Sequence, residues 1–183
     1  ILKSANMKTS DFDYELPEEL IAHYPTESRS SSRLLVGFGE IEHRTFKDIT
    51  DYFEEGDLII NNNTSVIPAR IFGKKDSGGS VELMLERQLS SNRALVQIRS
   101  GNPPKPGAKM IFNKYEAECI DRKDNFFIVQ FFESPAKVFN KIGHIPLPPY
   151  IKRNDEEIDR NRYATVYENK DFQNSVAAPT AGL

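Results

Sequence analysis

The sequence has few of the residues from which disulfides and metal sites are built. Its 183 residues include one cysteine, Cys119, three histidines and no tryptophan. A single cysteine excludes an internal disulfide and is typical of a reducing compartment. The three histidines, His23, His43 and His144, are too scattered for a closely spaced zinc motif, so we expect no metal.

Long apolar runs and a strong net charge are also missing. No run approaches the roughly 20 apolar residues that cross a bilayer, and no stretch resembles a signal peptide. We therefore expect a cytoplasmic protein without membrane contact. The net charge of −3 argues against non-specific coating of nucleic acid but allows a local basic groove. Residues 1–6 precede Met7, and we interpret them as a tag or readthrough remnant.

The common catalytic and nucleotide-binding motifs are absent as well. The sequence contains no Walker loop, no Rossmann glycine fingerprint, no nucleophile elbow and no zinc-protease helix. The lack of a glycine-rich loop after a strand disfavours a methyltransferase. Composition and spacing alone therefore indicate a globular protein without identifying its reaction.

The middle of the chain has the pattern of an all-β module. In one segment Val81, Leu83 and Leu85 alternate with more polar neighbours. Turn signals separate six such runs at intervals of roughly 8–12 residues, which predicts a small antiparallel barrel or sandwich. Closure would remove the exposed strand edges. The predicted strands are Ala69–Phe72, Ser80–Glu86, Arg93–Arg99, Lys109–Phe112, Glu116–Ile120 and Phe126–Phe132. Arg93, Arg99, Lys105 and Lys109 form either a basic face or ordinary solvated strand positions.

The flanking regions carry helix signals and short strands. Thr45 and Asp48 have capping-box spacing, and Ser134-Pro135 is a typical helix start. The predicted helices are Pro17–His23, Phe46–Glu55, Ala136–Ile142 and one that begins near residues 154–157. The predicted strands are Arg33–Phe38, Glu40–Arg44 and a buried strand, Asp57–Ile60.

A proline-rich strap, Gly143–Ile151, follows the β region. Pro146, Pro148 and Pro149 exclude a helix and force an extended backbone. The strap is either a crossing between domains or a Pro-rich linker. Its apolar residues Ile145 and Leu147 favour the crossing.

Two polar stretches have two interpretations each. Asn61, Asn62 and Asn63 directly follow an apolar run, where amides either read base and ribose edges or form an Asx-turn. Residue type does not decide between them. The Ser-rich stretch Thr26–Ser32 is either an anion site with Arg29 and Arg33 or a solvated loop.

Five stretches together resemble one family, the S-adenosylmethionine:tRNA ribosyltransferase-isomerases of queuosine biosynthesis. Each stretch is a weak signal, but their order and spacing also match, and the resemblance runs from Met7 to Leu183. It covers about the first half of a family member. The stretches are Tyr14–Ala22, Asn62–Arg70, Pro146–Ile151, Arg162–Tyr167 and Ala177–Leu183.

The resemblance implies a larger α/β domain interrupted by a small antiparallel six-stranded β-barrel. The α/β domain would comprise residues 7–68 and 141–183 and would be incomplete here. The barrel would comprise residues 69–140. We expect this chain to be inactive alone.

The resemblance also implies the chemistry. Family members use S-adenosylmethionine as a co-substrate that donates ribose, and no metal. The acceptor is 7-aminomethyl-7-deazaguanine at the tRNA anticodon, and the products are epoxyqueuosine-tRNA, adenine and methionine. The catalytic base is not identified from the sequence. The candidate substrate- and cofactor-binding residues are Asn62, Asn63, Thr64, Arg70, Tyr150, Arg162, Tyr163, Tyr167, Ala178, Pro179, Thr180 and Gly182.

Several of these candidates also have structural interpretations. Tyr150 is either a stacking surface or a core residue, and Arg70 either neutralises an anion or forms an ion pair within its domain. The alternative for the whole chain is a non-catalytic RNA- or protein-binding β-barrel module.

Overall fold

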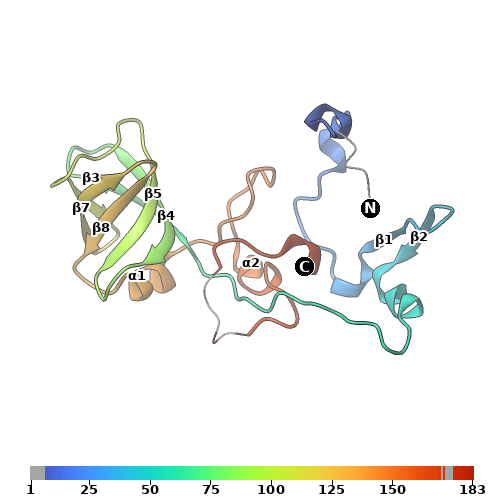
Figure 1. Ribbon diagram of the computed structural model, residues 1–183. Coiled ribbons are helices and arrows are strands. Elements are labelled where there is room, and N and C mark those ends of the chain that lie inside the picture. Colours follow the sequence, from blue (N-terminus) through green and yellow to red (C-terminus); the bar gives the residue numbers. More distant parts are fainter. Residues whose placement is uncertain (1–6, 170, 172–174) are drawn as a thin grey trace.

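The computed structural model describes residues 7–169, 171 and 175–183, so the six residues interpreted as a tag lie outside it. Figure 1 shows a barrel at one end, with the N-terminal and C-terminal segments extending away from it. Two connections leave the barrel, one before its first strand and one after the helix α1.

The predicted barrel is present and closed. Its strand order is β3-β4-β5-β8-β7-β6, and every neighbouring pair is antiparallel. This topology confirms the six-stranded barrel that the family resemblance implies, and it decides between the barrel and the sandwich that the alternation allowed. The strands are β3 (Arg70–Lys75), β4 (Ser80–Gln88), β5 (Arg93–Arg99), β6 (Lys109–Phe112), β7 (Tyr115–Lys123) and β8 (Phe126–Phe131).

The barrel holds the main hydrophobic core. Val81, Leu83 and Leu85 on β4 are all buried, as their alternation predicts. The helix α1 (Pro135–Ile142) packs onto this core, and the Phe139 ring meets the Phe131 ring edge-on with centroids 5.9 Å apart. The barrel therefore has a filled interior, and any ligand site must lie outside it.

The N-terminal region is less regular than predicted. The hairpin of β1 (Arg33–Val36) and β2 (Glu42–Thr45) is confirmed. The predicted helices Pro17–His23 and Phe46–Glu55 are shorter and of the 3-10 type, Glu18–Leu20 and Phe46–Tyr52, because few tertiary contacts extend them. The predicted start of the second is correct, since the Thr45 amide donates to Asp48 Oδ2 at 2.9 Å. Further 3-10 turns are Thr9–Phe12, Arg29–Ser31 and Thr180–Gly182.

The predicted buried strand Asp57–Ile60 is wrong for this chain. The segment has no strand assignment, and Leu58 and Ile60 are 84% and 86% exposed. A strand needs a hydrogen-bonded neighbour, and none of the described residues supplies one here.

The expected α/β character of the flanking region is not confirmed either. Outside the barrel and α1, the described residues contain one two-stranded sheet, 3-10 turns and the single short α-helix α2 (Glu157–Arg162). That helix begins where the acidic cluster near residues 154–157 predicts it. None of the helices in the described part of the chain is long and apolar enough to cross a membrane.

The proline strap connects the barrel to α2. Ile145 and Leu147 are only 4% and 6% exposed, which disfavours a solvated linker. At its start, the backbone of His144 exchanges hydrogen bonds with the backbone of Arg70 at 2.7 and 3.2 Å. The start of the strap is thus attached to β3, and the strap leads away from the barrel towards α2.

Candidate functional site

A cavity of about 260 Å³ lies where the N-terminal segment, the strap and α2 meet. Three of the predicted site residues line it: Tyr150, Arg162 and Tyr163. The wall also includes Tyr24 and Arg153, which sequence analysis did not select. The cavity therefore joins residues from the N-terminal segment, the strap and α2, together with Leu183 at the C-terminal end.

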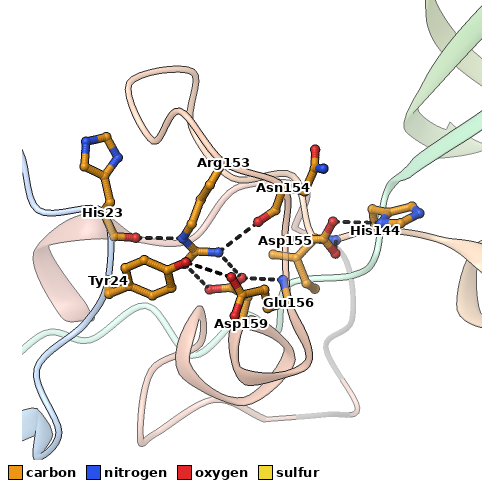
Figure 2. Close-up of polar contacts among 9 residues, drawn as sticks. His23, Tyr24, His144, Arg153, Asn154, Asp155, Glu156 and Asp159 are labelled. Carbon is orange, nitrogen blue, oxygen red and sulfur yellow. Dashed lines mark hydrogen bonds and ion pairs between the residues drawn. The ribbon is translucent and has the colours of Figure 1, made fainter.

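A buried ion pair holds one side of this cavity together (Figure 2). Arg153 forms a bidentate ion pair with Asp159. Its two terminal nitrogens lie 2.7 and 2.8 Å from the two carboxylate oxygens. Asp159 is 3% exposed. Its hydrogen bond with Arg153 holds the pKa of Asp159 below the usual value, so the carboxylate stays charged.

The same arginine reaches the N-terminal segment. Arg153 Nε donates to the His23 carbonyl at 2.8 Å, and its guanidinium carbon lies 4.2 Å from the centre of the Tyr24 ring. This distance is typical of a cation–π contact. The Tyr24 hydroxyl donates to Glu156 Oε1 at 2.8 Å, which raises the pKa of Tyr24. Tyr24 is therefore fixed at its ring and at its hydroxyl (Figure 2).

The predicted residue Arg162 has a structural contact of its own. Its terminal nitrogens donate to the carbonyls of Thr26 and Glu27 at 2.6 and 3.0 Å. Arg29 makes the reverse connection, donating to the Asn161 and Ala164 carbonyls near the end of α2. In this structure the Ser-rich stretch therefore contacts α2, and Arg29 is bonded to backbone carbonyls.

Tyr163 and Tyr150 lie close to the C-terminal segment. Burial raises the pKa of Tyr163, which keeps its hydroxyl neutral. Tyr150 is 49% exposed, so it is not a core residue. Leu183 also lines the cavity. The strap residue Tyr150 and the C-terminal Leu183 thus share the cavity wall.

The turn that contains Pro179, Thr180 and Gly182 packs against Tyr167. The Tyr167 hydroxyl donates to the Gly182 carbonyl at 3.3 Å, and a Cβ at residue 182 would lie 2.2 Å from that hydroxyl. The close approach to the Gly182 backbone is therefore made here by a tyrosine side chain. Neither Tyr167 nor this turn lines the cavity, but Leu183, which directly follows the turn, does.

The three polar residues Asn62, Asn63 and Thr64 do not line the cavity. Asn62 Oδ1 accepts from the Thr64 amide at 3.0 Å and from its hydroxyl at 2.7 Å, which is an Asx-turn. The Asn63 carbonyl accepts from the Asn169 amide at 2.8 Å. Of the two interpretations of these amides, the Asx-turn is the one that matches the contacts of Asn62 in this structure.

Arg70 also lies outside the cavity wall. Its Nε is 3.2 Å from Glu82 Oε1 on the neighbouring strand β4, an ion pair whose N–H is not aligned for a hydrogen bond. His144, beside it, has Nδ1 2.7 Å from Asp155 Oδ1, and the second oxygen of Asp155 accepts from the Ile145 amide. These contacts fix the start of the strap.

Sequence reasoning missed Tyr24, Arg153 and Asp159 for a physical reason. Asp159 lies in the segment predicted to be a helix, where a charged side chain is ordinary, and Arg153 is separated from His23 by 130 positions. One signal was available: Asp159 lies three residues after Glu156, and its carboxylate accepts from the Glu156 amide at 2.7 Å as a helix cap. Pairing with Arg153 depends on the fold.

The arrangement offers aromatic surfaces and fixed cations rather than metal ligands. No group of three or more His, Cys, Asp or Glu side chains suited to a metal ion occurs among the residues that the structure describes. Tyrosine faces suit planar rings, and arginines suit anionic groups.

Two comparisons with known proteins bear on this chain. The family model described as "Queuosine biosynthesis protein" matches residues 9–183. A crystal structure of an S-adenosylmethionine tRNA ribosyltransferase from Thermotoga maritima shares 36% sequence identity, with a TM-score of 0.38. The match covers 78% of this chain and 52% of that one, so the chain spans about half the length of that protein.

Proposed function

Because the chain belongs to the family of queuosine biosynthesis proteins, we propose that it supplies part of the active site of an S-adenosylmethionine:tRNA ribosyltransferase-isomerase. The reaction transfers and isomerises the ribosyl group of S-adenosylmethionine onto 7-aminomethyl-7-deazaguanine in tRNA. It yields epoxyqueuosine-tRNA, adenine and methionine. The observation that carries this proposal is the family match over residues 9–183.

The chemistry sets requirements that residues of this chain are suited to meet. The sulfonium acidifies the adjacent 5′ carbon, so the site needs a base, and the departing adenine must be held and stabilised. We assign the holding role to Tyr150 and Tyr163 and the electrostatic role to Arg162, because all three line one cavity. The general base is left unassigned.

The other candidates have supporting roles in this proposal. Asn62, Asn63, Thr64 and Arg70 lie outside the cavity wall, so we place them where the tRNA would extend beyond it. Tyr167 and the turn from Ala178 to Gly182 shape the cavity indirectly, since Tyr167 contacts Gly182.

We also propose that residues 7–68 and 141–183 belong to one discontinuous domain, interrupted by the barrel of residues 69–140. Two hydrogen bonds between the two parts support this division. The Ile67 amide donates to the Ser175 carbonyl at 3.0 Å, and the Arg162 guanidinium donates to the Thr26 carbonyl. The α/β character of that domain would then require strands that the described residues do not contain.

The reaction is tested by incubating the protein, as its gene encodes it, with S-adenosylmethionine and tRNA that carries 7-aminomethyl-7-deazaguanine. Release of free adenine, followed by chromatography, is the expected result. S-adenosylhomocysteine would instead indicate a methyltransferase. RNA binding without either product would indicate the non-catalytic β-barrel module. The 183-residue chain alone should release no adenine, and adenine release by it would contradict our assignment of an incomplete site.

A further inference from the structure

The outer wall of the barrel carries an exposed aromatic ring that lies away from the cavity. Phe72 on β3 is 51% exposed, whereas the preceding residue, Ile71, is buried inside the barrel. A single exposed apolar residue is ordinary, but this ring borders a groove of about 570 Å³ formed by residues of β3, β4, β5 and the turn after β5. β3, β4 and β5 are neighbours in the barrel (Figure 1), and the groove shares no lining residue with the cavity.

The start of the strap holds the Phe72 ring in place. The His144 ring meets it edge-on, with the ring centroids 5.2 Å apart. His144 is itself held, because its Nδ1 lies 2.7 Å from Asp155 Oδ1 and its backbone pairs with that of Arg70. A ring that is restrained before a ligand arrives loses little conformational entropy on binding. Phe72 is therefore suited to act as a stacking surface.

Cationic side chains surround this ring on the same wall. Because side chains alternate between the two faces of a strand, Arg70 and Lys74 lie on the same face of β3 as Phe72. On the neighbouring strands, Glu82 stands opposite Phe72, and Arg99 stands opposite Glu82. This patch thus carries three cations and one carboxylate, although the whole chain has a net charge of −3. A local excess of positive charge attracts an anionic partner.

The donors of this patch remain available to a ligand. Arg99 and Lys74 are exposed, and no described residue accepts a hydrogen bond from either side chain. Arg70 has its Nε 3.2 Å from Glu82 Oε1, and its terminal nitrogens have no acceptor among the described residues. In the cavity, by contrast, the terminal nitrogens of Arg162 already donate to two backbone carbonyls. Recognition of phosphate oxygens needs donors that are not already used in this way.

The positive charge of the barrel strands is concentrated at this groove. The sequence left open whether Arg93, Arg99 and Lys109 form a basic face. Arg93 Nε donates to Gln130 Oε1 at 3.0 Å, and Lys109 stands opposite Glu118 in the register of β6 and β7. Arg99 instead borders the groove together with Phe72. A partner attracted by the barrel would therefore meet it here.

An accessible aromatic ring flanked by cations is the arrangement that binds unpaired nucleotides, whose bases stack on the ring while their phosphates meet the cations. We propose that the outer barrel wall at Phe72, with Arg70, Lys74 and Arg99 around it, is a contact surface for single-stranded RNA. The surface holds nucleotides that take no part in the reaction, and so it goes beyond the proposed function. It also stands independently of that reaction, because it needs no modified base.

Fluorescence anisotropy of a dye-labelled RNA stem-loop, made only of unmodified nucleotides, tests this proposal on the 183-residue chain. A fully paired RNA duplex of the same length is titrated beside it. We expect saturable binding of the stem-loop and weaker binding of the duplex, since paired bases cannot stack on Phe72. Phe72→Leu should weaken stem-loop binding about tenfold, the size expected for losing one stacked base. Phe72→Tyr keeps the ring and should change binding less than about threefold.

Arg99 provides a second readout, which is electrostatic. The logarithm of the binding constant falls linearly with the logarithm of the salt concentration, with a slope of about −0.7 for each phosphate neutralised on a single strand. Arg99→Gln should therefore make the slope shallower by about 0.7. Arg93→Gln is the matched control, because Arg93 lies on the same strand and donates to Gln130. It should leave the slope unchanged.

Phe132→Leu is the matched control for the ring. Phe132 is 67% exposed and lies beside Glu116 and Glu133, where acidic side chains would repel RNA. Its replacement should leave the affinity for the stem-loop unchanged. Far-UV circular dichroism checks that each variant keeps the fold, and the salt dependence of Arg99→Gln tests the wall even if Phe72→Leu fails to fold.

The outcomes separate this surface from the proposed reaction. Absence of stem-loop binding, or equal affinities of Phe72→Leu and Phe132→Leu, overturns the inference and leaves the wall to a protein partner. Duplex binding as tight as stem-loop binding, or equal salt slopes for Arg99→Gln and Arg93→Gln, overturns it as well. If RNA binding depends on Phe72 but the gene-encoded protein releases no adenine, the surface stands and the proposed reaction falls. Adenine release with unchanged RNA binding by Phe72→Leu gives the opposite result.

Discussion

Asp159 is the residue whose charge depends most clearly on its surroundings. It is buried, its carboxylate meets Arg153 with two hydrogen bonds, and it also accepts from the Glu156 amide. Burial of a carboxylate is unfavourable unless its oxygens are paired in this way. The pair connects the strap to α2 and, through Arg153, to the N-terminal segment.

Replacing this carboxylate should destabilise the junction in a pH-dependent way. The pKa of Asp159 is depressed in the folded state, below an unfolded value of about 3.9. Its contribution is therefore fully present above the unfolded pKa and is lost as the pH falls through the folded pKa. We expect Asp159→Asn to lower the free energy of unfolding by roughly 3 kcal/mol at pH 7. Urea unfolding measures this change.

The difference in the free energy of unfolding between wild type and Asp159→Asn should become smaller when urea unfolding is measured below about pH 4. Glu42→Gln is the matched control, because Glu42 pairs with Arg44 at an exposed site. It should cost less than about 1 kcal/mol. An equal loss for Asp159→Asn at both pH values would show that the charge of Asp159 is not what stabilises the junction.

The strands and the strap show how elements place the cavity. Barrel closure depends on a tight approach between β3 and β6, which pair at Lys74 and Ile111. Next to this pair, a Cβ at Gly73 would lie 2.3 Å from the Ile111 carbonyl oxygen and 2.5 Å from the Phe112 ring. β3 in turn holds the start of the strap through Arg70 and His144.

Gly73→Ala should therefore destabilise the barrel. Overpacking of this kind typically costs about 1–3 kcal/mol, and thermal unfolding followed by circular dichroism measures it. Gly101→Ala is the control, since nothing lies within 4 Å of the added Cβ. Equal melting temperatures for the two variants would mean that β3 and β6 do not approach this closely.

At the scale of the whole molecule, burial is uneven. The barrel contains fully buried side chains such as Leu83, whereas Leu58 and Ile60 are exposed in an apolar segment predicted to be a strand. A groove of about 370 Å³ lies beside this segment, lined by residues of β1, of Phe46–Tyr52 and by Leu58. The N-terminal region therefore depends less on its own core than the barrel does.

Polar substitutions should show this contrast. Leu58→Gln and Ile60→Gln should change the free energy of unfolding of this chain by less than about 0.5 kcal/mol, because their side chains already face solvent. Leu83→Gln, the buried control, should cost more than about 3 kcal/mol. A large effect at Leu58 or Ile60, measured by urea unfolding, would indicate that the segment is paired in solution.

Local signals were sufficient for part of the fold. The barrel strands follow from alternation within each run, the hairpin from its glycine turn, and the extended strap from three prolines, because each pattern constrains neighbouring residues directly. The strand prediction for Asp57–Ile60 was wrong for the same reason, because a local pattern constrains only neighbouring residues. Its apolar residues favour burial, but burial requires a partner that no local pattern supplies.

The sequence by itself determined the six strands of the barrel, the strap and the family, through periodicity, proline geometry and motifs in register. Only the tertiary structure decided which polar and aromatic residues share a cavity. Tyr24, Arg153 and Asp159 meet because the strap and α2 return to the N-terminal segment. Contacts between residues 130 positions apart depend on the path of the whole chain, and no local preference encodes that path.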